Sequence, residues 1–380
     1  MLEEQWPSMD LVAESLMREL ASDPALAVCP VMVRPGLLPR IGRWRQPGTI
    51  APTLARVVNR FWLYRRALPP LRSADVFHVV DHSYGHLALV LPQARTVVTC
   101  HDIDAFDQHA ASNGAAAGLP QFLVRRLAAG LARAARVVCP SQTTASALVD
   151  RQLVAADRVA VVYNGVDLPE TTAAAAESMT APWLGPVGTF TDLLHVSSTI
   201  PRKRIDVLLN VFAGVLAQWP SSRLVRVGGR LAPAQRALAQ RLGVLGRVVE
   251  LPSLDRQVLA AVYRRATLLL STSEREGFGL PVAEALAAGT PVVATDIPVF
   301  REVGGLAASY ARLGDTAAWV QAVTALLREA SDQPDVWRRR QLTAQARGAE
   351  FTWHKYAREM TDIYRSVATS ASAGRATARS

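Results

Sequence analysis

The sequence predicts an α/β protein with two doubly wound parallel sheets. Short β-branched runs alternate with helical patterns along almost the whole chain. Near-continuous apolar strands of this kind are typical of parallel sheets that are covered by helices on both faces. The chain has 380 residues, which is enough for two domains of ordinary size. A Thr- and Ala-rich stretch at 170–188 separates the two halves, and a linker is expected there.

The first half carries five strand-like runs, at 26–33, 75–80, 95–100, 136–141 and 158–165. Helical patterns are found at 51–66, 119–134 and 141–150. A doubly wound domain normally opens with a strand, yet residues 8–21 have a helical pattern. The first strand is therefore expected either upstream of Met1 or not at all.

The second half repeats the alternation, with strands at 193–198, 223–229, 247–252, 267–273 and 291–296. Its helices are expected near 205–218, 232–243, 255–266, 282–288 and 315–331. Two such domains place a ligand cleft between them, at the carboxyl ends of the strands.

Composition excludes some classes of protein. Half of the residues are hydrophobic, yet no apolar run approaches the roughly 20 residues that cross a bilayer. The acidic N-terminus lacks the apolar core of a secretory signal, so a cytoplasmic chain is expected. Cys29, Cys100 and Cys139 lie far apart in apolar runs, which predicts buried, reduced thiols.

The stretch "EGFGLPVAE", residues 276–284, joins a buried strand to a helix. Gly277 and Gly279 permit a tight turn and a close approach of a ligand to the backbone. Pro281 suits the first turn of a helix, whose exposed N–H groups and dipole favour an anion such as phosphate. Glu276 then precedes the helix and Glu284 lies in its first turn.

Three other interpretations of this stretch are less favoured. In a continuous helix the two carboxylates would be about 12 Å apart, whereas glycosidase pairs need roughly 5–9.5 Å. A metal site would need further ligands, and Glu274 is the only other carboxylate of the loop. In a dinucleotide fingerprint the third glycine position is occupied by Val282, and the preceding strand is the fourth of its domain, so that match is weak.

The longer stretch "EGFGLPVAEALAAGTPVVATD" resembles the E-x7-E motif of the retaining glycosyltransferases of family 4, which have the GT-B fold. The resemblance covers most of the chain, through "TCHDIDAF" at 99–106, "VVYNGVD" at 161–167, the phosphate loop after 193–198 and "FTWHKYAREMTDIYRSV" at 351–367. It implies an acceptor-binding domain over 1–169, a linker at 170–188 and a nucleotide-sugar domain over 189–350. A crossover helix at 351–368 and a disordered tail at 369–380 complete the expected organisation.

The resemblance also implies roles for individual residues. Glu276 would contact the donor sugar, Glu284 would hold the ribose, and His101 would face the sugar across the cleft, the alternative being a loop histidine satisfied by backbone. Lys203 and Arg202 would neutralise the leaving phosphate. The remaining donor-binding residues are expected in the phosphate loop and the glycine-rich loop: Ser198, Thr199, Gly277, Phe278, Gly279 and Leu280.

Two departures from the family pattern matter. The family has Gly-Arg where this chain has Ser197-Ser198, so an arginine for the diphosphate is missing, and Arg202 or Arg204 would replace it. The first domain also lacks the family's early glycine-rich loop, which leaves the acceptor contacts open.

The resemblance implies transfer from a nucleotide-diphosphate sugar to a hydroxyl acceptor, without a cofactor or a metal and with retention at the anomeric carbon. Asp102-x-Asp104 resembles the metal-binding motif of the other large glycosyltransferase fold, but the two-domain pattern argues against that assignment. His78, His82 and His86 recur at four-residue spacing, yet the run that contains His78 is strand-like, which disfavours a zinc site.

The net charge of +10 is unevenly distributed. Nine arginines fall between Arg34 and Arg72, interleaved with aromatic residues. Such a segment suits an anionic membrane surface or an anionic acceptor, or else a solvated face. The expected location is the cytoplasm, with possible attachment to the inner face of the membrane. Two other functions remain open: a basic nucleic-acid-binding protein, although no nucleic acid is expected as a partner, and an NAD(P)-dependent oxidoreductase.

Overall fold

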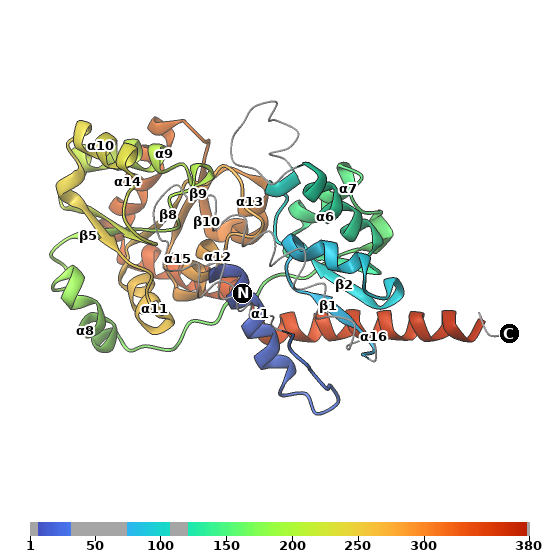
Figure 1. The fold of residues 1–380 in the computed structure, drawn as a ribbon. Helices are drawn as coiled ribbons and strands as arrows, with labels where there is room; N and C mark the ends of the chain where they lie inside the picture. The colour runs from blue at the N-terminus through green and yellow to red at the C-terminus, as the bar shows by residue number, and fades with distance from the viewer. Residues whose placement is uncertain (1–6, 32–73, 107–120, 378–380) are drawn as a thin grey trace, which may run out of the picture. The chain divides into compact units, whose positions relative to one another are not determined.

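The computed structural model describes residues 7–31, 74–106 and 121–377, which belong to two compact units (Figure 1). Unit 1 comprises Met1–Gly165 and Trp353–Ser380, and unit 2 comprises Val166–Thr352. Each unit contains one parallel sheet with helices packed on it. The predicted α/β class with two parallel-sheet domains is therefore confirmed.

Unit 1 has a four-stranded parallel sheet in the order β1-β2-β3-β4. The strands are β1 (Phe77–Val79), β2 (Thr96–Thr99), β3 (Arg136–Cys139) and β4 (Val159–Val161). The helical segments with them are η3 (His82–Leu89), α6 (Gln121–Arg133) and α7 (Gln142–Asp150). All four strands fall within predicted runs, because short β-branched runs between turns mark parallel strands well.

Helices from opposite ends of the chain lie side by side in unit 1 (Figure 1). They are α1 (Pro7–Leu20) and α16 (Trp353–Thr377). Leu16 of α1 and Met360 of α16 share a hydrophobic core with Val97 of the sheet. The predicted disorder at 369–380 is wrong as far as Thr377, because α16 continues to that residue. Its Ala-rich sequence favours helix, and Ala371 is buried.

The predicted strand at 26–33 does not form over its described residues, 26–31. Pro30 interrupts the run, and a proline removes the amide that a central strand donates to its neighbour. Cys29 is consequently exposed, so the prediction of a buried thiol is wrong there and holds for Cys100 and Cys139. The predicted helix at 51–66 and the basic segment at 34–72 lie outside the described residues.

Unit 2 has a six-stranded parallel sheet in the order β10-β9-β8-β5-β6-β7. The strands are β5 (Thr191–Val196), β6 (Ser222–Val227), β7 (Val248–Leu251), β8 (Leu268–Ser271), β9 (Val292–Thr295) and β10 (Ala308–Ala311). Its helices are α8 (Ala173–Leu184), α9 (Ile205–Gln218), α10 (Pro233–Arg241), α11 (Arg256–Arg265), α12 (Leu280–Ala288), α13 (Pro298–Gly304), α14 (Thr316–Asp332) and α15 (Pro334–Gly348). The strand order reverses between β5 and β8, where doubly wound sheets bind ligands beyond the carboxyl ends of their strands.

The main core of unit 2 lies between its sheet and helices α9, α10 and α14, which Figure 1 shows together on one side. Trp319 of α14 and Phe212 of α9 are completely buried in this core. Helix α8 forms within the predicted linker at 170–188, where Thr172 caps its first turn by accepting from the amide of Ala175. The sequence pattern also did not predict β10, α13 or α15.

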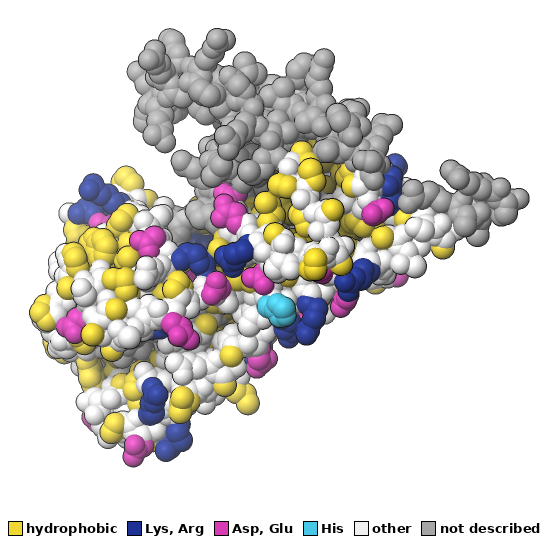
Figure 2. All heavy atoms as spheres, turned by 90° about the horizontal axis from the view of Figure 1, so that it is seen from below, with side chains coloured by type: hydrophobic (Ala, Val, Ile, Leu, Met, Phe, Trp, Pro, Cys, Tyr) yellow, Lys and Arg dark blue, Asp and Glu magenta, His cyan; other side chains and the backbone are white. Residues whose placement is uncertain are grey.

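No helix among the described residues has both the length and the apolar character that crossing a membrane requires. Figure 2 shows acidic and basic side chains interspersed over the described residues of the face that it presents.

Candidate functional site

Two loops meet at the switch point of the unit 2 sheet. One follows β5 and contains the short helix η6 (Pro201–Lys203), and the other follows β8. The backbone amide of Glu274 donates to the carbonyl of Arg202 at 2.9 Å, and the Thr272 hydroxyl donates to the carbonyl of Lys203, also at 2.9 Å. The loops are therefore held together by hydrogen bonds of their own.

Glu276 lies between two cations from the other loop. Arg202 donates from Nη1 to Glu276 Oε2 at 2.9 Å, and Lys203 Nζ donates to Oε1. The side chains are mostly buried, with 10% exposure at Glu276 and 12% at Lys203. Burial by itself would raise the pKa of Glu276, but the charges of Lys203 and Arg202 outweigh it and lower that pKa. The cluster thus holds an ionised carboxylate and one surplus positive charge at neutral pH.

Glu284 lies in a different environment, on α12. The Tyr263 hydroxyl of α11 donates to Glu284 Oε2 at 2.8 Å, and both side chains are buried. Burial raises the pKa of Glu284, while the Tyr263 hydrogen bond and the Arg256 charge oppose that rise. Each glutamate therefore has its own set of partners.

The turn before α12 requires glycine. Gly279 adopts φ of +91°, in the left-handed region, and a Cβ added there would lie 2.8 Å from Phe300 Cε1. Among the described residues, no hydrogen bond engages the amides of Gly279 and Leu280 at the start of the helix. Donors of this kind, together with the helix dipole, favour an anion.

The loop after β5 rests on a buried histidine. His195 Nδ1 donates to the Leu270 carbonyl at 2.8 Å, and His195 Nε2 lies 2.7 Å from Ser197 Oγ, whose hydroxyl donates to the Ser198 carbonyl at 2.8 Å. Ser198 is exposed, and the carbonyl of Thr199 accepts from Gln235 Nε2 at 3.2 Å. The predicted phosphate-loop residues therefore lie next to Arg202 and Lys203, in a loop that hydrogen bonds hold in place.

His195 makes unfolding depend on pH. Burial and the charge of Arg226 lower its pKa from 6.5 to about 3. Because the pKa of His195 is lower in the folded state, its neutral imidazole stabilises the fold at pH values above 6.5, the pKa in the unfolded chain. This stabilisation is lost progressively as the pH falls from 6.5 toward 3. At pH 5 we expect His195 alone to cost about 2 kcal/mol.

Urea unfolding at pH 7.5 and pH 5.0 measures this cost. His195→Asn should reduce the difference in unfolding free energy between the two pH values by about that 2 kcal/mol. An unchanged difference would show that folding does not lower the pKa of His195.

His101 belongs to unit 1. Its Nε2 lies 2.8 Å from the Val80 carbonyl and donates to it, and its backbone amide donates to His82 Nδ1 at 3.3 Å. Burial lowers the pKa of His101, so the imidazole is neutral at pH 7. Its role toward the donor sugar stays a prediction.

Other sequence features serve local structure. His78 lies in β1, where its ring nitrogens are 2.7 Å from the Tyr364 hydroxyl and 2.8 Å from the Thr99 hydroxyl. Asp102 accepts from the amide of Asp104 at 3.2 Å. Within the described ranges, no three His, Cys, Asp or Glu side chains are grouped so that they could hold a metal ion.

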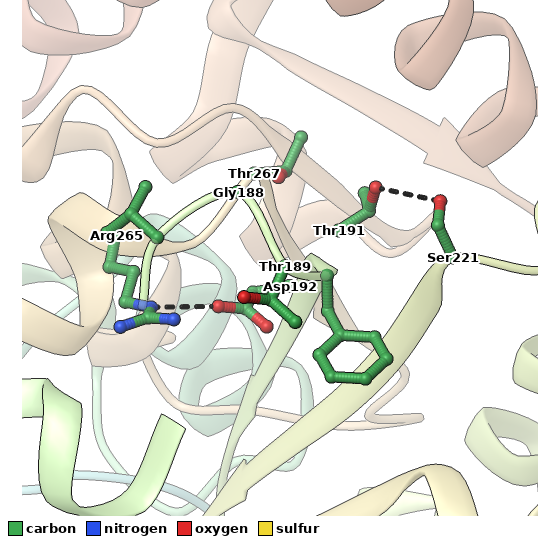
Figure 3. A pocket seen from close by; sticks show the side chains of 9 residues that line it. Gly188, Thr189, Thr191, Asp192, Ser221, Arg265 and Thr267 are labelled. Atoms are coloured by element: carbon green, nitrogen blue, oxygen red, sulfur yellow. Dashed lines mark hydrogen bonds and ion pairs between the residues drawn. The ribbon is translucent and has the colours of Figure 1, made fainter. Parts of the chain in front are cut away.

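A separate pocket lies at the N-terminal ends of the strands of the unit 2 sheet, opposite to the end that carries Glu276 (Figure 3). Figure 3 shows Arg265 directed at Asp192, to which it donates at 3.0 Å. Arg223 donates to both oxygens of the same carboxylate, from Nε to Oδ1 and from Nη2 to Oδ2. Both carboxylate oxygens are thereby engaged, and this pocket lies away from Glu276.

The sequence alone did not reveal three residues of the site. Tyr263 escaped notice because its contact with Glu284 joins two helices 21 positions apart. His195 and Arg226 did leave a signal, since each interrupts an otherwise apolar strand, in "LLHVSS" and "RLVRVGG".

Comparison with known proteins agrees with this geometry. Residues 13–170 match the family model described as Glycosyltransferase Family 4, and residues 191–329 match the one described as Glycosyl transferases group 1. A D-inositol 3-phosphate glycosyltransferase of Nocardia farcinica is 33% identical over 70% of this chain and 60% of its own length. A phosphatidyl-myo-inositol mannosyltransferase of Mycobacterium leprae is 34% identical over 45% of each chain. The chain thus spans less than two thirds of the length of either relative.

Among solved structures, Anabaena HepE in complex with UDP and glucose superposes with a TM-score of 0.71. That match has 19% sequence identity and covers 94% of this chain and 96% of HepE. It extends over both units, which confirms the predicted GT-B fold. From the two family models and this fold, the chain belongs to the group 1, family 4 glycosyltransferases.

Proposed function

We propose that this protein transfers a sugar from a nucleotide-diphosphate sugar to a hydroxyl acceptor, with retention of the anomeric configuration. One observation carries the proposal: Arg202 and Lys203 converge on Glu276 at the switch point of the unit 2 sheet. The inositol-directed names of the relatives support an acceptor of the sugar, inositol or glycolipid class.

The site is suited to a leaving diphosphate. Breaking the bond between the anomeric carbon and the phosphate oxygen leaves negative charge on the phosphate. Preorganised donors aimed at such charge are worth about 3 kcal/mol each. Lys203, Arg202 and the amides of Gly279 and Leu280 are the donors in this proposal.

Donor binding would exchange partners within the cluster. In the structure the two cations hold Glu276, whereas a bound diphosphate would attract them and free the carboxylate for the sugar hydroxyls. Its lowered pKa makes Glu276 a hydrogen-bond acceptor at neutral pH and unsuited to act as a general acid. The acceptor hydroxyl attacks the anomeric carbon, and its proton goes to an oxygen of the departing phosphate.

The nucleotide would extend from this cluster along α12, with Glu284 accepting from a ribose hydroxyl. Tyr263 holds one oxygen of Glu284, which fixes the direction of the other. The reaction proposed here needs no metal, because Arg202 and Lys203 supply positive charge at the phosphates. The basic segment 34–72, outside the described residues, keeps its proposed role at an anionic membrane surface or acceptor on the cytoplasmic side.

A thermal-shift screen of nucleotide sugars tests the proposal. In the presence of a chelator, at least one UDP-, GDP- or ADP-sugar at millimolar concentration should raise the melting temperature of the wild-type chain. Glu284→Ala and Lys203→Ala should reduce that shift. No shift with any nucleotide sugar, or a shift with NAD(P) or with DNA that is lost at high salt, would contradict the proposal and favour one of the alternative functions.

A further inference from the structure

A row of three polar residues crosses the sheet of unit 2 near the carboxyl ends of its strands. In the strand register His195 of β5 is paired with Arg226 of β6, which in turn is paired with Glu250 of β7. The side chains of register partners lie on the same face of a parallel sheet. This row lies one residue before the carboxyl ends of β5 and β6, directly beneath the loops of the candidate site. Polar residues that break the apolar pattern of buried strands are candidates for a functional role.

Arg226 is the unusual member of the row. Its side chain is completely buried, and its guanidinium donates to two backbone carbonyls, that of Ser197 at 3.0 Å and that of Gly229 at 3.3 Å. Its Nε has no hydrogen-bond partner. Within the described part of the chain, no ion pair joins Arg226 to a carboxylate.

The nearest carboxylate in the row is already engaged. Glu250 accepts from Arg236 at 2.9 Å and also from the amide of Leu231. A buried cation without a carboxylate partner is costly, because burial removes its hydration and carbonyls return only part of that stabilisation. The fold therefore retains at this place a buried positive charge that has no ion-pair partner and that Glu250 compensates only in part, through space.

The charge lies beneath the segment from which the expected arginine is missing. Arg226 contacts the carbonyl of Ser197, the residue before Ser198. A Cβ added to Gly228 would lie 2.3 Å from Ser197 O, so the loop after β5 packs directly on the turn after β6. A guanidinium in this position points at the base of the loop that carries Arg202 and Lys203.

We infer that Arg226 supplies, from beneath the loop, the positive charge that Ser198 does not provide, and that the diphosphate of the donor compensates this charge. The inference rests on the proposed function. Arg226 is a positioning residue, which holds the Ser197 carbonyl and contributes its field without touching the ligand. Water and salt screen buried charges much less than exposed ones. The buried Arg226 guanidinium can therefore stabilise a phosphate that is bound on the loop after β5 without contacting it.

Titration calorimetry with uridine and guanosine and their mono- and diphosphates tests the inference. Arg226→Met should weaken binding of the diphosphate about tenfold or more, and that of the nucleoside by less than about twofold. Arg226→Lys keeps the charge and should retain most of the diphosphate affinity. Adding Ser198→Arg to the Arg226→Met variant should restore it, whereas Ser198→Arg in the wild-type chain should add less.

Several results would overturn the inference. One is an equal loss for nucleoside and diphosphate in Arg226→Met, which would indicate packing alone. Another is Arg226→Lys behaving like Arg226→Met, with no restoration by Ser198→Arg. If Arg226→Met does not fold, Arg226→Gln gives the same test, because its amide can still donate to a backbone carbonyl but carries no charge; an Arg226→Gln variant that keeps the wild-type affinity for the diphosphate contradicts the inference. Failure of the wild-type chain to bind any nucleoside diphosphate would instead contradict the proposed function, on which the inference depends.

Discussion

Replacing Lys203 with Met should lower kcat/KM for donor consumption by about 100- to 1000-fold, because the leaving phosphate loses one preorganised cation. The fold should be affected much less, since Glu276 keeps its 2.9 Å bond to Arg202. The effect is measured as the steady-state rate at which the nucleoside diphosphate is released from the nucleotide sugar that raises the melting temperature in the thermal-shift screen. The melting temperature of the variant shows whether the fold is intact.

Arg204→Met is the matched control. Arg204 is the next cation in the same loop, but it pairs with Asp206 at 2.8 Å on the surface and with Glu274 at 3.5 Å. Exposed pairs of this kind contribute about 0–1 kcal/mol, so activity and stability should change little. Equal losses in Lys203→Met and Arg204→Met would show that Lys203 has no special relation to the phosphate.

Replacing Asp192 with Ala should destabilise unit 2 by about 3–5 kcal/mol, because it leaves two buried guanidinium groups without their counter-ion. The Asp192 carboxylate, 5% exposed, accepts from Arg265 at 3.0 Å and from Arg223 at 3.1 Å. Both arginines also donate to the carbonyl of Leu184 at the end of α8. The ion cluster therefore joins the start of β5 to α8.

Urea unfolding of Asp192→Ala beside Asp206→Ala tests this prediction. Asp206 pairs with Arg204 at the surface, and its loss should cost no more than about 1 kcal/mol. If the two substitutions lower the free energy of unfolding by the same amount, the buried cluster contributes no more to stability than a surface pair.

Much of the fold could be predicted because the alternation of apolar runs and helical patterns is a local property. Strand β8, "LLLS", and helix α9 follow directly from such patterns. The run at 26–33 has the same local pattern but forms no strand over 26–31, since a strand also requires a partner that the pattern does not specify. Helix α8 and the end of α16 escaped prediction because Ala-rich stretches suit both linkers and helices.

The residues of the candidate site were identified from one loop motif and its resemblance to a family, whereas their partners required the structure. Nothing in the sequence indicates that Lys203 and Arg202 contact Glu276, 73 and 74 positions away. The contact between Tyr263 and Glu284 is likewise a property of helix packing. The missing arginine at Ser198 was visible in the sequence, but its proposed substitute, Arg226, became apparent only from the strand register.

A crystal structure of the chain with the nucleoside diphosphate of its donor tests the proposed donor site. We expect the diphosphate within hydrogen-bond reach of Lys203 Nζ and of the amides at the start of α12, with a ribose hydroxyl on Glu284. Glu276 would then no longer be held by both cations. A nucleotide bound at the N-terminal ends of the strands, beside Asp192, would contradict the proposed donor site. A nucleotide whose phosphates lie away from Lys203 would contradict it as well.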